Sequence, residues 1–398
     1  MMKKDWRKDK LKDLCEDIFS GGTPDTRKSE YWGGNINWLS SGETRNIFIN
    51  NTEKTITKEG VKNSSTRLAQ KWDLVMACAG QGHTRGQVSL CLIDTYVNQS
   101  ILVIRTNKNI LSPSFLFYTL SSKYQFLRDF SSSNSIRGSI TCPMLGSLDI
   151  NYPEMEDQDK ISQILINYDY LIENNTKRIK LLEKIAKLIY EEWFVKFKFP
   201  GHEKAKFIDS ELGKIPEGWE VCKVGGLIKR LKAGKKFTQN NVFEKGFIPV
   251  VDQSTKEILG YHNEEADHLA TSNNPIMVFG DHTCKMKILT KSFSVGPNVI
   301  PFKALNRPES FIYYMINSLV NTREYKRHWN VLCSKKAIIP SLEITNLFNE
   351  KIIIILNHLS LLKEKNINLS KTRDLLLPRL ITGKVDVSEL DIQVEVKA

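Results

Sequence analysis

The chain has 398 residues, enough for two or three domains with their own cores, and its 41% hydrophobic, 9% aromatic and 26% charged residues are typical of a globular protein. An excess of 57 basic over 45 acidic residues gives a net charge of +12, which favours polyanionic partners, although a protein can also be merely basic. The charged start "MMKKDWRKDK" does not resemble a signal peptide, no apolar run is long enough to cross a bilayer, and seven scattered cysteines without a C-x-x-C pair fit reduced thiols, so we expect a cytoplasmic protein with no membrane partner.

The first distinctive segment is "GGTPDTRKSEYWGGNINWLSSGE", Gly21–Glu43, which is glycine-rich, basic and aromatic. It lacks the G-x-x-x-x-G-K-[ST] spacing of a phosphate-binding loop, and no apolar strand leads directly into it. We interpret Gly21–Pro24 as the turn into a sheet, with Arg27 and Lys28 near phosphates and the aromatic side chains packing the domain.

Short apolar runs separated by turn residues predict β-strands at Ile36–Leu39, Leu74–Ala77, Val88–Ile93 and Val97–Ile104. The segment "GQGHTRG", Gly80–Gly86, is spaced G-x-G-x-x-x-G and is followed by a strand, whereas a dinucleotide loop needs a helix there. We therefore predict a hairpin-like tip. Ser112 as N-cap and Pro113 at the first helical position predict a helix that begins there.

From Gln158 onward, apolar residues recur every three or four positions over about five heptads, which indicates a long helix with a coiled-coil seam. The polar Asn175 occupies one seam position. The apolar seam positions are Ile161, Leu165, Tyr168, Ile172, Ile179, Leu182, Ala186, Ile189 and Trp193.

The second half of the chain echoes the first in the same order, which indicates a repeated architecture. "DLVMACAGQGHTRG" from Asp73 corresponds to "NPIMVFGDHTCK" from Asn274, and each reads as a strand followed by glycine and a His-Thr pair. "SPSFLFYTL" from Ser112 corresponds to "RPESFIYYMI" from Arg307. A second seam follows, with Asn366 and Arg373 as polar members and with Phe348, Ile352, Ile355, Leu359, Leu362, Leu369, Leu376 and Leu380 as apolar members.

These patterns predict an α+β fold in which two pseudo-repeated mixed α/β domains are separated by two long antiparallel coiled-coil helices. If the two helices are centred on one another, Asn175 faces Asn366 and Tyr168 faces Arg373, and the Asn pair fixes the register. A helix of about 36 residues is about 54 Å long, so the pair would hold the domains at a set separation. The alternative is two ordinary amphipathic helices buried in separate domains.

Catalytic and metal-binding motifs do not emerge: the histidines form no H-E-x-x-H or Cys/His cluster, and there is no G-x-S-x-G elbow. The loops instead carry side chains suited to phosphates and base edges. In the first half these are Arg27, Lys28, Ser40, Ser41, Arg45, Gln81, His83, Thr84, Arg85, Asn98, Gln99 and Arg137. In the second half they are Lys232, Lys235, Lys236, Gln239, Asn240, Gln253, His282, Lys285, Lys287 and Asn298.

At Gly21–Glu43 the chain resembles the target-recognition domains of the specificity (S) subunits of Type I restriction–modification systems, whose pattern is close to G-G-T-P-S-x-x-x-x-x-Y-W-G-G-x-I-x-W-x-S-S-G-D. Glu43 stands where Asp is common. The segments "YPEMEDQDKISQIL", "IPEGWE" and "LLLPRLITGKVDV" are also similar to that family. The second half keeps Gly234 but lacks the T-P and Y-W-G-G, which leaves open which of its residues contact DNA.

The resemblance implies five segments: target-recognition domain 1 at 1–152, spacer helix 1 at 153–200, target-recognition domain 2 at 201–340, spacer helix 2 at 341–385 and a tail at 386–398. It implies that each domain reads one half of a split double-stranded DNA target, while the helices set the gap and dock two methylation subunits. Restriction subunits complete such complexes. The resemblance also implies that S-adenosylmethionine and ATP bind to the partner subunits, and that this chain is not an enzyme and holds no metal or cofactor.

Two other classes of function stay open at the level of sequence. A self-contained DNA methylase or nuclease would need a cofactor loop or a metal-binding carboxylate pair, and we find neither motif. A coiled-coil scaffold without a DNA-reading role would show no salt-dependent DNA binding.

Overall fold

The structure is a computed structural model, and it describes residues 6–80, 82–132, 138–254, 257–319 and 327–394. The chain has mixed helix and strand content and divides into two compact units. Unit 1 comprises Met1–Glu173 and Asn366–Ala398, and unit 2 comprises Asn174–Lys365. Each unit therefore combines one predicted domain with part of both predicted long helices. No helix in the described part of the chain is long and apolar enough to cross a membrane.

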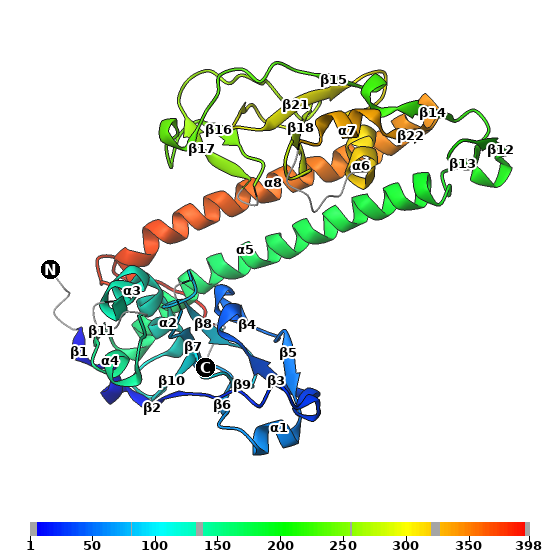
Figure 1. The fold of residues 1–398 in the computed structure, drawn as a ribbon. Helices are drawn as coiled ribbons and strands as arrows, with labels where there is room; N and C mark the ends of the chain where they lie inside the picture. Colours follow the sequence, from blue (N-terminus) through cyan, green and yellow to red (C-terminus); the bar gives the residue numbers. More distant parts are fainter. Residues whose placement is uncertain (1–5, 81, 133–137, 255–256, 320–326, 395–398) are drawn as a thin grey trace. The chain divides into compact units, whose positions relative to one another are not determined.

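The larger sheet of unit 1 has the strand order β2-β10-β7-β8-β4 (Figure 1). Neighbouring strands are antiparallel, except that β4 and β8 are parallel. The predicted strand Leu74–Ala77 is confirmed with the same bounds, and the predicted Val88–Ile93 strand begins where expected but ends two residues earlier. The strands are β2 Cys15–Ser20, β10 Ile101–Thr106, β7 Leu74–Ala77, β8 Val88–Cys91 and β4 Phe48–Ile49.

A second sheet of unit 1 has the order β5-β3-β9-β6, and a separate antiparallel pair joins β1 to β11. Within the second sheet β3 and β9 are parallel and the other pairs are antiparallel. The strands are β5 Lys54–Ile56, β3 Trp32–Leu39, β9 Thr95–Val97, β6 Arg67–Ala69, β1 Arg7–Lys10 and β11 Asp149–Tyr152.

The prediction of one strand over Val97–Ile104 is wrong, because a turn divides this run between the two sheets. The Ile101 N–H donates to the Asn98 carbonyl (3.2 Å), and the Asn98 side chain accepts from the Ser100 N–H (3.0 Å). Such a local Asx hydrogen bond stabilises a turn. The chain thus leaves β9 in the second sheet and enters β10 in the larger one.

Helices α2, α3 and α4 of unit 1 pack with the larger sheet in one apolar core, whereas α1 contacts β3 of the second sheet. The prediction that a helix starts at Ser112 and Pro113 is confirmed: Ser112 is the extended N-cap and Pro113 the first residue of α2. Phe115, Leu116 and Leu120 of this helix are fully buried. The helices are α1 Lys58–Lys62, α2 Pro113–Ser122, α3 Tyr124–Ser132 and α4 Cys142–Gly146.

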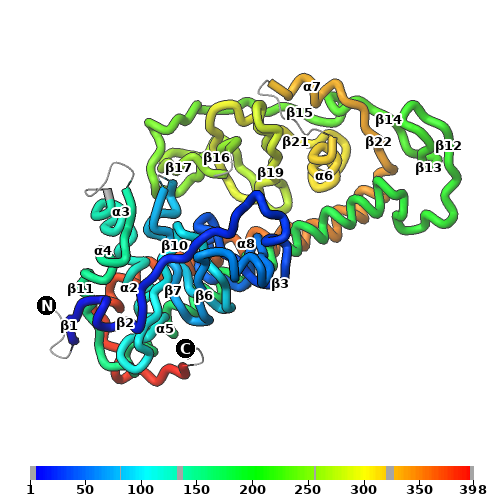
Figure 2. The backbone as a smooth tube through the Cα atoms, turned by 60° about the horizontal axis from the view of Figure 1, so that its bottom comes forward, coloured from blue at the N-terminus to red at the C-terminus, as the bar shows by residue number. Residues whose placement is uncertain are grey.

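Unit 2 contains a four-stranded sheet in the order β15-β21-β18-β19 and a three-stranded sheet in the order β17-β16-β20 (Figures 1 and 2). All pairs are antiparallel except β16 with β20. These strands are β15 Ile228–Arg230, β21 Val299–Ala304, β18 Ile276–Gly280, β19 Met286–Leu289, β17 Ile258–His262, β16 Ile248–Val251 and β20 Ser294–Val295.

Two antiparallel strand pairs and two helices complete the domain part of unit 2. An aromatic cluster lies beside them, in which Trp219 contacts Phe194, Phe197 and Phe199 with ring centroids 5.0–6.0 Å apart. The elements are β12 Phe207–Ser210, β13 Gly213–Pro216, β14 Glu220–Lys223, β22 Lys336–Ile339, α6 Glu309–Leu319 and α7 Trp329–Ser334. Short 3-10 turns in the two units cover Leu11–Leu14, Ser29–Tyr31, Ser41–Arg45, His202–Lys204, Val224–Gly226 and Gln239–Asn241.

The two long helices are α5, Met155–Tyr190, which continues into a π-helical turn at Glu191–Val195, and α8, Leu342–Leu380 (Figure 1). Every apolar seam residue predicted on them is buried or half-buried. Several apolar residues outside the predicted seam are exposed, among them Leu171, Leu181, Ile185 and Leu188 of α5, but Ile166, Tyr190 and Leu356 are buried. The heptad pattern therefore identified part of the buried face of each helix.

The polar seam residue Arg373 lies one position from the predicted register in unit 1. Arg373 of α8 binds the carboxylate of Asp169, although the register predicted Tyr168, its half-buried neighbour, as the facing residue. The Asn366 side chain donates to the Ile172 carbonyl (3.3 Å), so the two helix segments of this unit run antiparallel. Asn175 is buried in unit 2, and its pairing with Asn366 stays a prediction.

Candidate nucleic-acid interface

Gly21–Pro24 begins the connection from β2 in the larger sheet of unit 1 to β3 in the second sheet, and the turn of this connection falls just after it, at Thr26 and Arg27. The Gly22 N–H donates to the Val97 carbonyl (3.0 Å), and the Trp38 indole donates to the Gly22 carbonyl (3.4 Å). A Cβ at Gly21 would lie 2.0 Å from the Val97 carbonyl oxygen, so a larger residue does not fit here. The glycine pair lets the backbone lie directly on β9.

Arg27 lies in this turn and Lys28 follows it, and both are exposed, as predicted for residues available to phosphates. Arg27 makes a two-pronged ion pair with Asp25 (3.0 and 2.9 Å), and these hydrogen bonds lower the pKa of Asp25 to about 2. Lys28 donates to the hydroxyl of the buried Tyr31 (3.1 Å). Both cations are thus held in place while their side chains face solvent.

Several polar candidates in unit 1 have structural partners. The Ser40 hydroxyl and N–H both donate to the buried Glu43 carboxylate (2.9 Å each), in a capping box that begins the turn containing Ser41. Arg45 forms an exposed ion pair with Glu53 (2.6 Å). The Gln99 side chain accepts from Thr23, and that of the half-buried Asn98 accepts from a backbone N–H in its turn.

The Gly80–Gly86 segment connects the antiparallel strands β7 and β8, which confirms the predicted hairpin-like tip. His83 is exposed and Thr84 half-buried, but Arg85 is 7% exposed, so the structure places its side chain beneath the loop. A Cβ on Gly138 would lie 1.5 Å from an Arg85 guanidinium nitrogen, which shows how closely the chain covers it. Two other predicted donors, Gln81 and Arg137, lie outside the described residues.

Two residues of α3 that the sequence analysis did not single out hold this loop. The Tyr124 hydroxyl donates to the His83 carbonyl (2.6 Å), and Arg128 donates to the Gly82 carbonyl (2.8 Å). Arg128 also lies over the Tyr124 ring, at 5.6 Å from its centroid. No sequence motif marks these contacts, because they join residues more than 40 positions apart.

In unit 2 the structure brings together Gln253, His282 and Lys287. The Gln253 side chain accepts from the His282 N–H (3.2 Å), and the Thr283 hydroxyl donates to the Gln253 carbonyl (2.9 Å). Lys287 is half-buried and donates to the carbonyls of Asp252 (2.7 Å) and Glu257 (2.9 Å); burial lowers its pKa. Lys285 and Asn298, in contrast, are exposed.

The β18–β19 loop of unit 2 is anchored by Asp281, which the sequence analysis did not single out. Its carboxylate is 8% exposed and accepts from the backbone N–H groups of His328 (3.0 Å) and Trp329 (2.9 Å) at the start of α7. A carboxylate at this position satisfies helix N–H groups that otherwise have no partner. The loop that carries His282 and Lys285 is thereby fixed to α7.

The basic segment before β16 carries the remaining candidates, which are Lys232, Lys235, Lys236, Gln239 and Asn240, and all are exposed. Lys235 forms an ion pair with Glu264. Beneath it, the buried Phe237 ring stacks on His262 with centroids 4.1 Å apart. Thr238 and Asn241 form a capping box that orders the following turn.

The sequence matches the family model described as "Type I restriction modification DNA specificity domain" over residues 3–184. It is 30% identical to the Type I restriction enzyme MjaIX specificity subunit of Methanocaldococcus jannaschii over 97% of this chain and 95% of that protein. The chain belongs to the Type I restriction enzyme specificity subunits. The HindI specificity subunit of Haemophilus influenzae is 22% identical over 96% of this chain and all of that protein. The fold is similar to a crystal structure of the Type I restriction–modification S subunit from M. genitalium, with a TM-score of 0.63, 14% identity and coverage of 94% and 96% of the two chains.

The strand registers of this specificity subunit align β3 with β16. Trp38 and Leu39 pair in parallel with β9 as Val250 and Val251 pair with β20. Counting back by residue number from these pairs sets Phe243–Gly246, "FEKG", beside Tyr31–Gly34, across a register shift between Trp32 and Ile36 in β3 and ahead of the start of β16 at Ile248. The sequence comparison missed this correspondence because the glycine is the only residue of the four that is retained.

Gly34 and Gly246 each lie against the neighbouring antiparallel strand. A Cβ at Gly34 would be 2.4 Å from the Ile56 carbonyl oxygen, and a Cβ at Gly246 would be 2.8 Å from the Tyr261 Cβ. Gly34 thus lies against backbone atoms and Gly246 mainly against side-chain atoms, and neither position has room for a side chain. The segments that follow the two turns are comparable in position, although their side chains differ.

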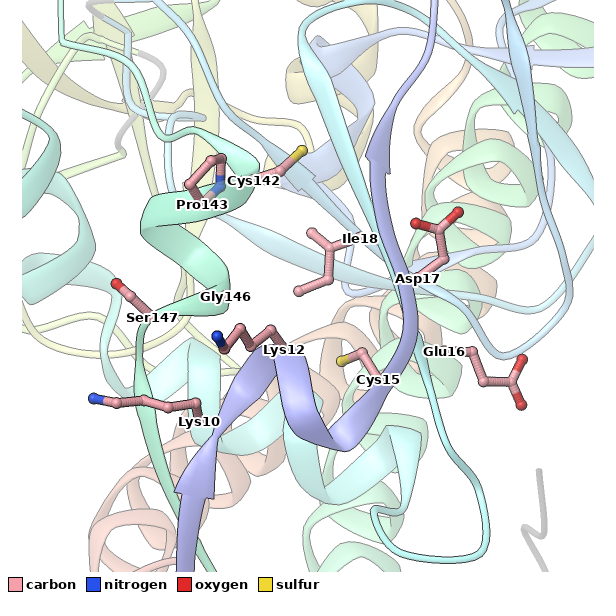
Figure 3. Close-up of a pocket in the computed structure, with 10 residues that line it drawn as sticks. All are labelled: Lys10, Lys12, Cys15, Glu16, Asp17, Ile18, Cys142, Pro143, Gly146 and Ser147. Atoms are coloured by element: carbon pink, nitrogen blue, oxygen red, sulfur yellow. The ribbon is translucent and has the colours of Figure 1, made fainter.

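A cavity of about 540 Å³ in unit 1 lies between the first strands and α4 (Figure 3). Lys10 and Ser147 lie toward one end and Cys142 toward the other, while Glu16 and Asp17 point away from α4. Burial raises the pKa of Cys15 to about 12 and also raises that of Cys142, which favours the protonated thiol at both positions. Among the described residues, no group of three His, Cys, Asp or Glu side chains could hold a metal ion.

Proposed function

We propose that this specificity subunit reads a split double-stranded DNA target, with the domain of each unit contacting one half. The observation that carries the proposal is the repetition of one strand arrangement in both units: a central strand flanked by antiparallel partners, β10 in one and β21 in the other, beside a smaller sheet with a single parallel pair. Two similar folds with different exposed side chains suit a target whose halves differ in sequence.

The long helices are proposed to form an antiparallel coiled-coil spacer that sets the gap between the half-sites. In each unit, segments of α5 and α8 share the core with the neighbouring domain. The apolar residues on their outer faces, such as Leu181 and Ile354, are exposed and suit the docking of two methylation subunits.

The chain itself is proposed to be non-catalytic, with S-adenosylmethionine and ATP bound by methylation and restriction subunits. The match to the DNA specificity domain and to relatives named as specificity subunits supports this view. The basic net charge and the exposed cations Arg27, Lys28, Lys236 and Lys285 support contact with DNA phosphates.

The test is to co-express the chain with the methylation subunit encoded beside it and to map methylated adenines by long-read sequencing. We expect a split motif with a fixed gap, and no such methylation when this chain is omitted. Exchange of residues 1–150 for those of another family member should alter one half of the motif only. Methylation that persists without the chain, or a change in both halves after the exchange, would contradict the proposal.

A further inference from the structure

The segment that precedes β16 in unit 2 presents two aromatic rings to solvent. Phe247 is 86% exposed and Phe243 is 60% exposed. By the strand register, Phe247 stands in the position of Asn35 in unit 1, which is an exposed polar residue. The exposed ring is thus a feature of the second unit alone, and the apolar core of that unit does not require it.

The backbone beneath these rings is held in place. Phe243 exchanges two backbone hydrogen bonds with Tyr261 (2.8 Å each), and the Phe247 N–H donates to the Asn263 side chain (3.2 Å). The tight contact of Gly246 with β17 fixes the chain between them. An exposed aromatic side chain on an ordered backbone loses little conformational entropy when it meets a partner.

The surroundings of the rings indicate a nucleic acid as that partner. Residues 231–247 contain four lysines against the single carboxylate of Glu244, and the amides of Gln239, Asn240 and Asn241 are exposed beside them. Lysine is depleted at the centre of protein–protein interfaces. Cations, amides and an exposed aromatic ring together are the combination that contacts phosphates, base edges and base faces.

We propose that Phe247 stacks on an unstacked base, or enters a base step, in the half-site read by unit 2, with Phe243 supporting it from the same segment. This inference rests on the proposed function and adds an asymmetry to it: the second half-site is distorted by an apolar wedge, whereas the position of Asn35 in the first half offers only a polar contact. Proteins that insert such wedges kink the duplex at the site of insertion.

The experiment uses the full chain with its methylation subunit and a duplex that contains the split motif found by methylation mapping. A 2-aminopurine base is placed in turn at each non-methylated adenine of both halves. The wild-type complex should raise its fluorescence at one position of the second half. Phe247→Ala should abolish that signal and weaken binding about ten- to a hundred-fold, the range expected for one base–aromatic stack. Phe247→Trp should retain both.

Phe207→Ala, which removes an exposed ring from β12, is the matched control and should bind like the wild type. If Phe247→Ala binds within two-fold of the wild type, or if it loses the methylation subunit while the free chain keeps its DNA affinity, the inference is wrong. A wild-type chain that directs no methylation at all would instead refute the proposed function, so the two failures are distinguishable.

Discussion

Asp169 places a carboxylate on the buried side of α5, and its two partners come from distant parts of unit 1. It accepts from the Tyr118 hydroxyl (2.7 Å) and from Arg373, and its side chain is 2% exposed. Burial raises the pKa of Tyr118 well above its ordinary value, so the phenol stays protonated as a donor. Arg373→Ala leaves this carboxylate uncompensated and should cost about 3–5 kcal/mol in the free energy of unfolding, measured by urea denaturation.

The matched control is Lys363→Ala, which breaks an exposed ion pair with Glu183 and should cost less than about 1 kcal/mol. Replacement of both Asp169 and Arg373 by Leu should restore much of the loss, because no buried charge then lacks its partner. Equal losses for Arg373→Ala and Lys363→Ala would mean that the Asp169 site is open to water and would contradict this account.

Lys287 should make the free energy of unfolding depend on pH, in the opposite direction to a lysine whose pKa is raised by an ion pair. Because burial lowers its pKa in the folded state, the unfolded chain binds more protons between that value and the ordinary lysine value of 10.5. Stability should therefore rise with pH across this interval relative to Lys287→Met, and the difference should be constant at lower pH. Thermal melts of both proteins over pH 7–10.5 measure this difference in stability. Parallel plots of melting temperature against pH would show that the Lys287 ammonium is well hydrated in the folded state, which would contradict the prediction.

At the scale of elements, the pairing of β3 with β5 in the second sheet of unit 1 depends on close backbone approach. Gly34→Ala would force a Cβ against the Ile56 carbonyl, and overpacking of this kind typically costs about 1–3 kcal/mol. Gly82→Ala, where no atom lies within 4 Å of the added Cβ, should change stability by less than about 0.5 kcal/mol. Urea denaturation compares them, and similar losses would indicate that the β3–β5 approach is not tight in solution.

The elements that the sequence predicted are those specified by local patterns. Periodicity located both long helices and their buried stripes, and the Ser112–Pro113 signal located the start of α2. The turn at Asn98 was missed because the apolar residues on both sides resemble one strand. Arg85 was predicted as a surface donor, and its burial depends on Gly138, 53 positions away, which no local pattern reports.

At the scale of the whole molecule, the two units share a strand arrangement but differ in the side chains that they expose. The strand orders β2-β10-β7-β8 and β5-β3-β9 of unit 1 are repeated as β15-β21-β18-β19 and β17-β16-β20 in unit 2, yet Tyr31 is buried and Phe243 is exposed. Backbone pairing constrains the sheet, whereas an exposed side chain is constrained mainly by what it contacts. The family could therefore be recognised from sequence, while the exposed residues of the second unit that are proposed to contact DNA required the strand register.

The net charge of +12 leads to a prediction for DNA binding as a whole, because each neutralised phosphate releases counterions. If about six phosphates are contacted, the logarithm of the binding constant should fall against the logarithm of salt concentration with a slope of about −5.

Lys285 and Lys287 are close in sequence but differ in their surroundings, so they can be compared as test and control. Lys285 is exposed, while the Lys287 ammonium donates to two backbone carbonyls. Lys285→Gln should therefore reduce the slope by about one, and Lys287→Gln should leave it unchanged. Fluorescence anisotropy with a labelled target duplex at 50–300 mM salt measures both, and a larger effect at Lys287 would show that its ammonium leaves those carbonyls to reach the DNA.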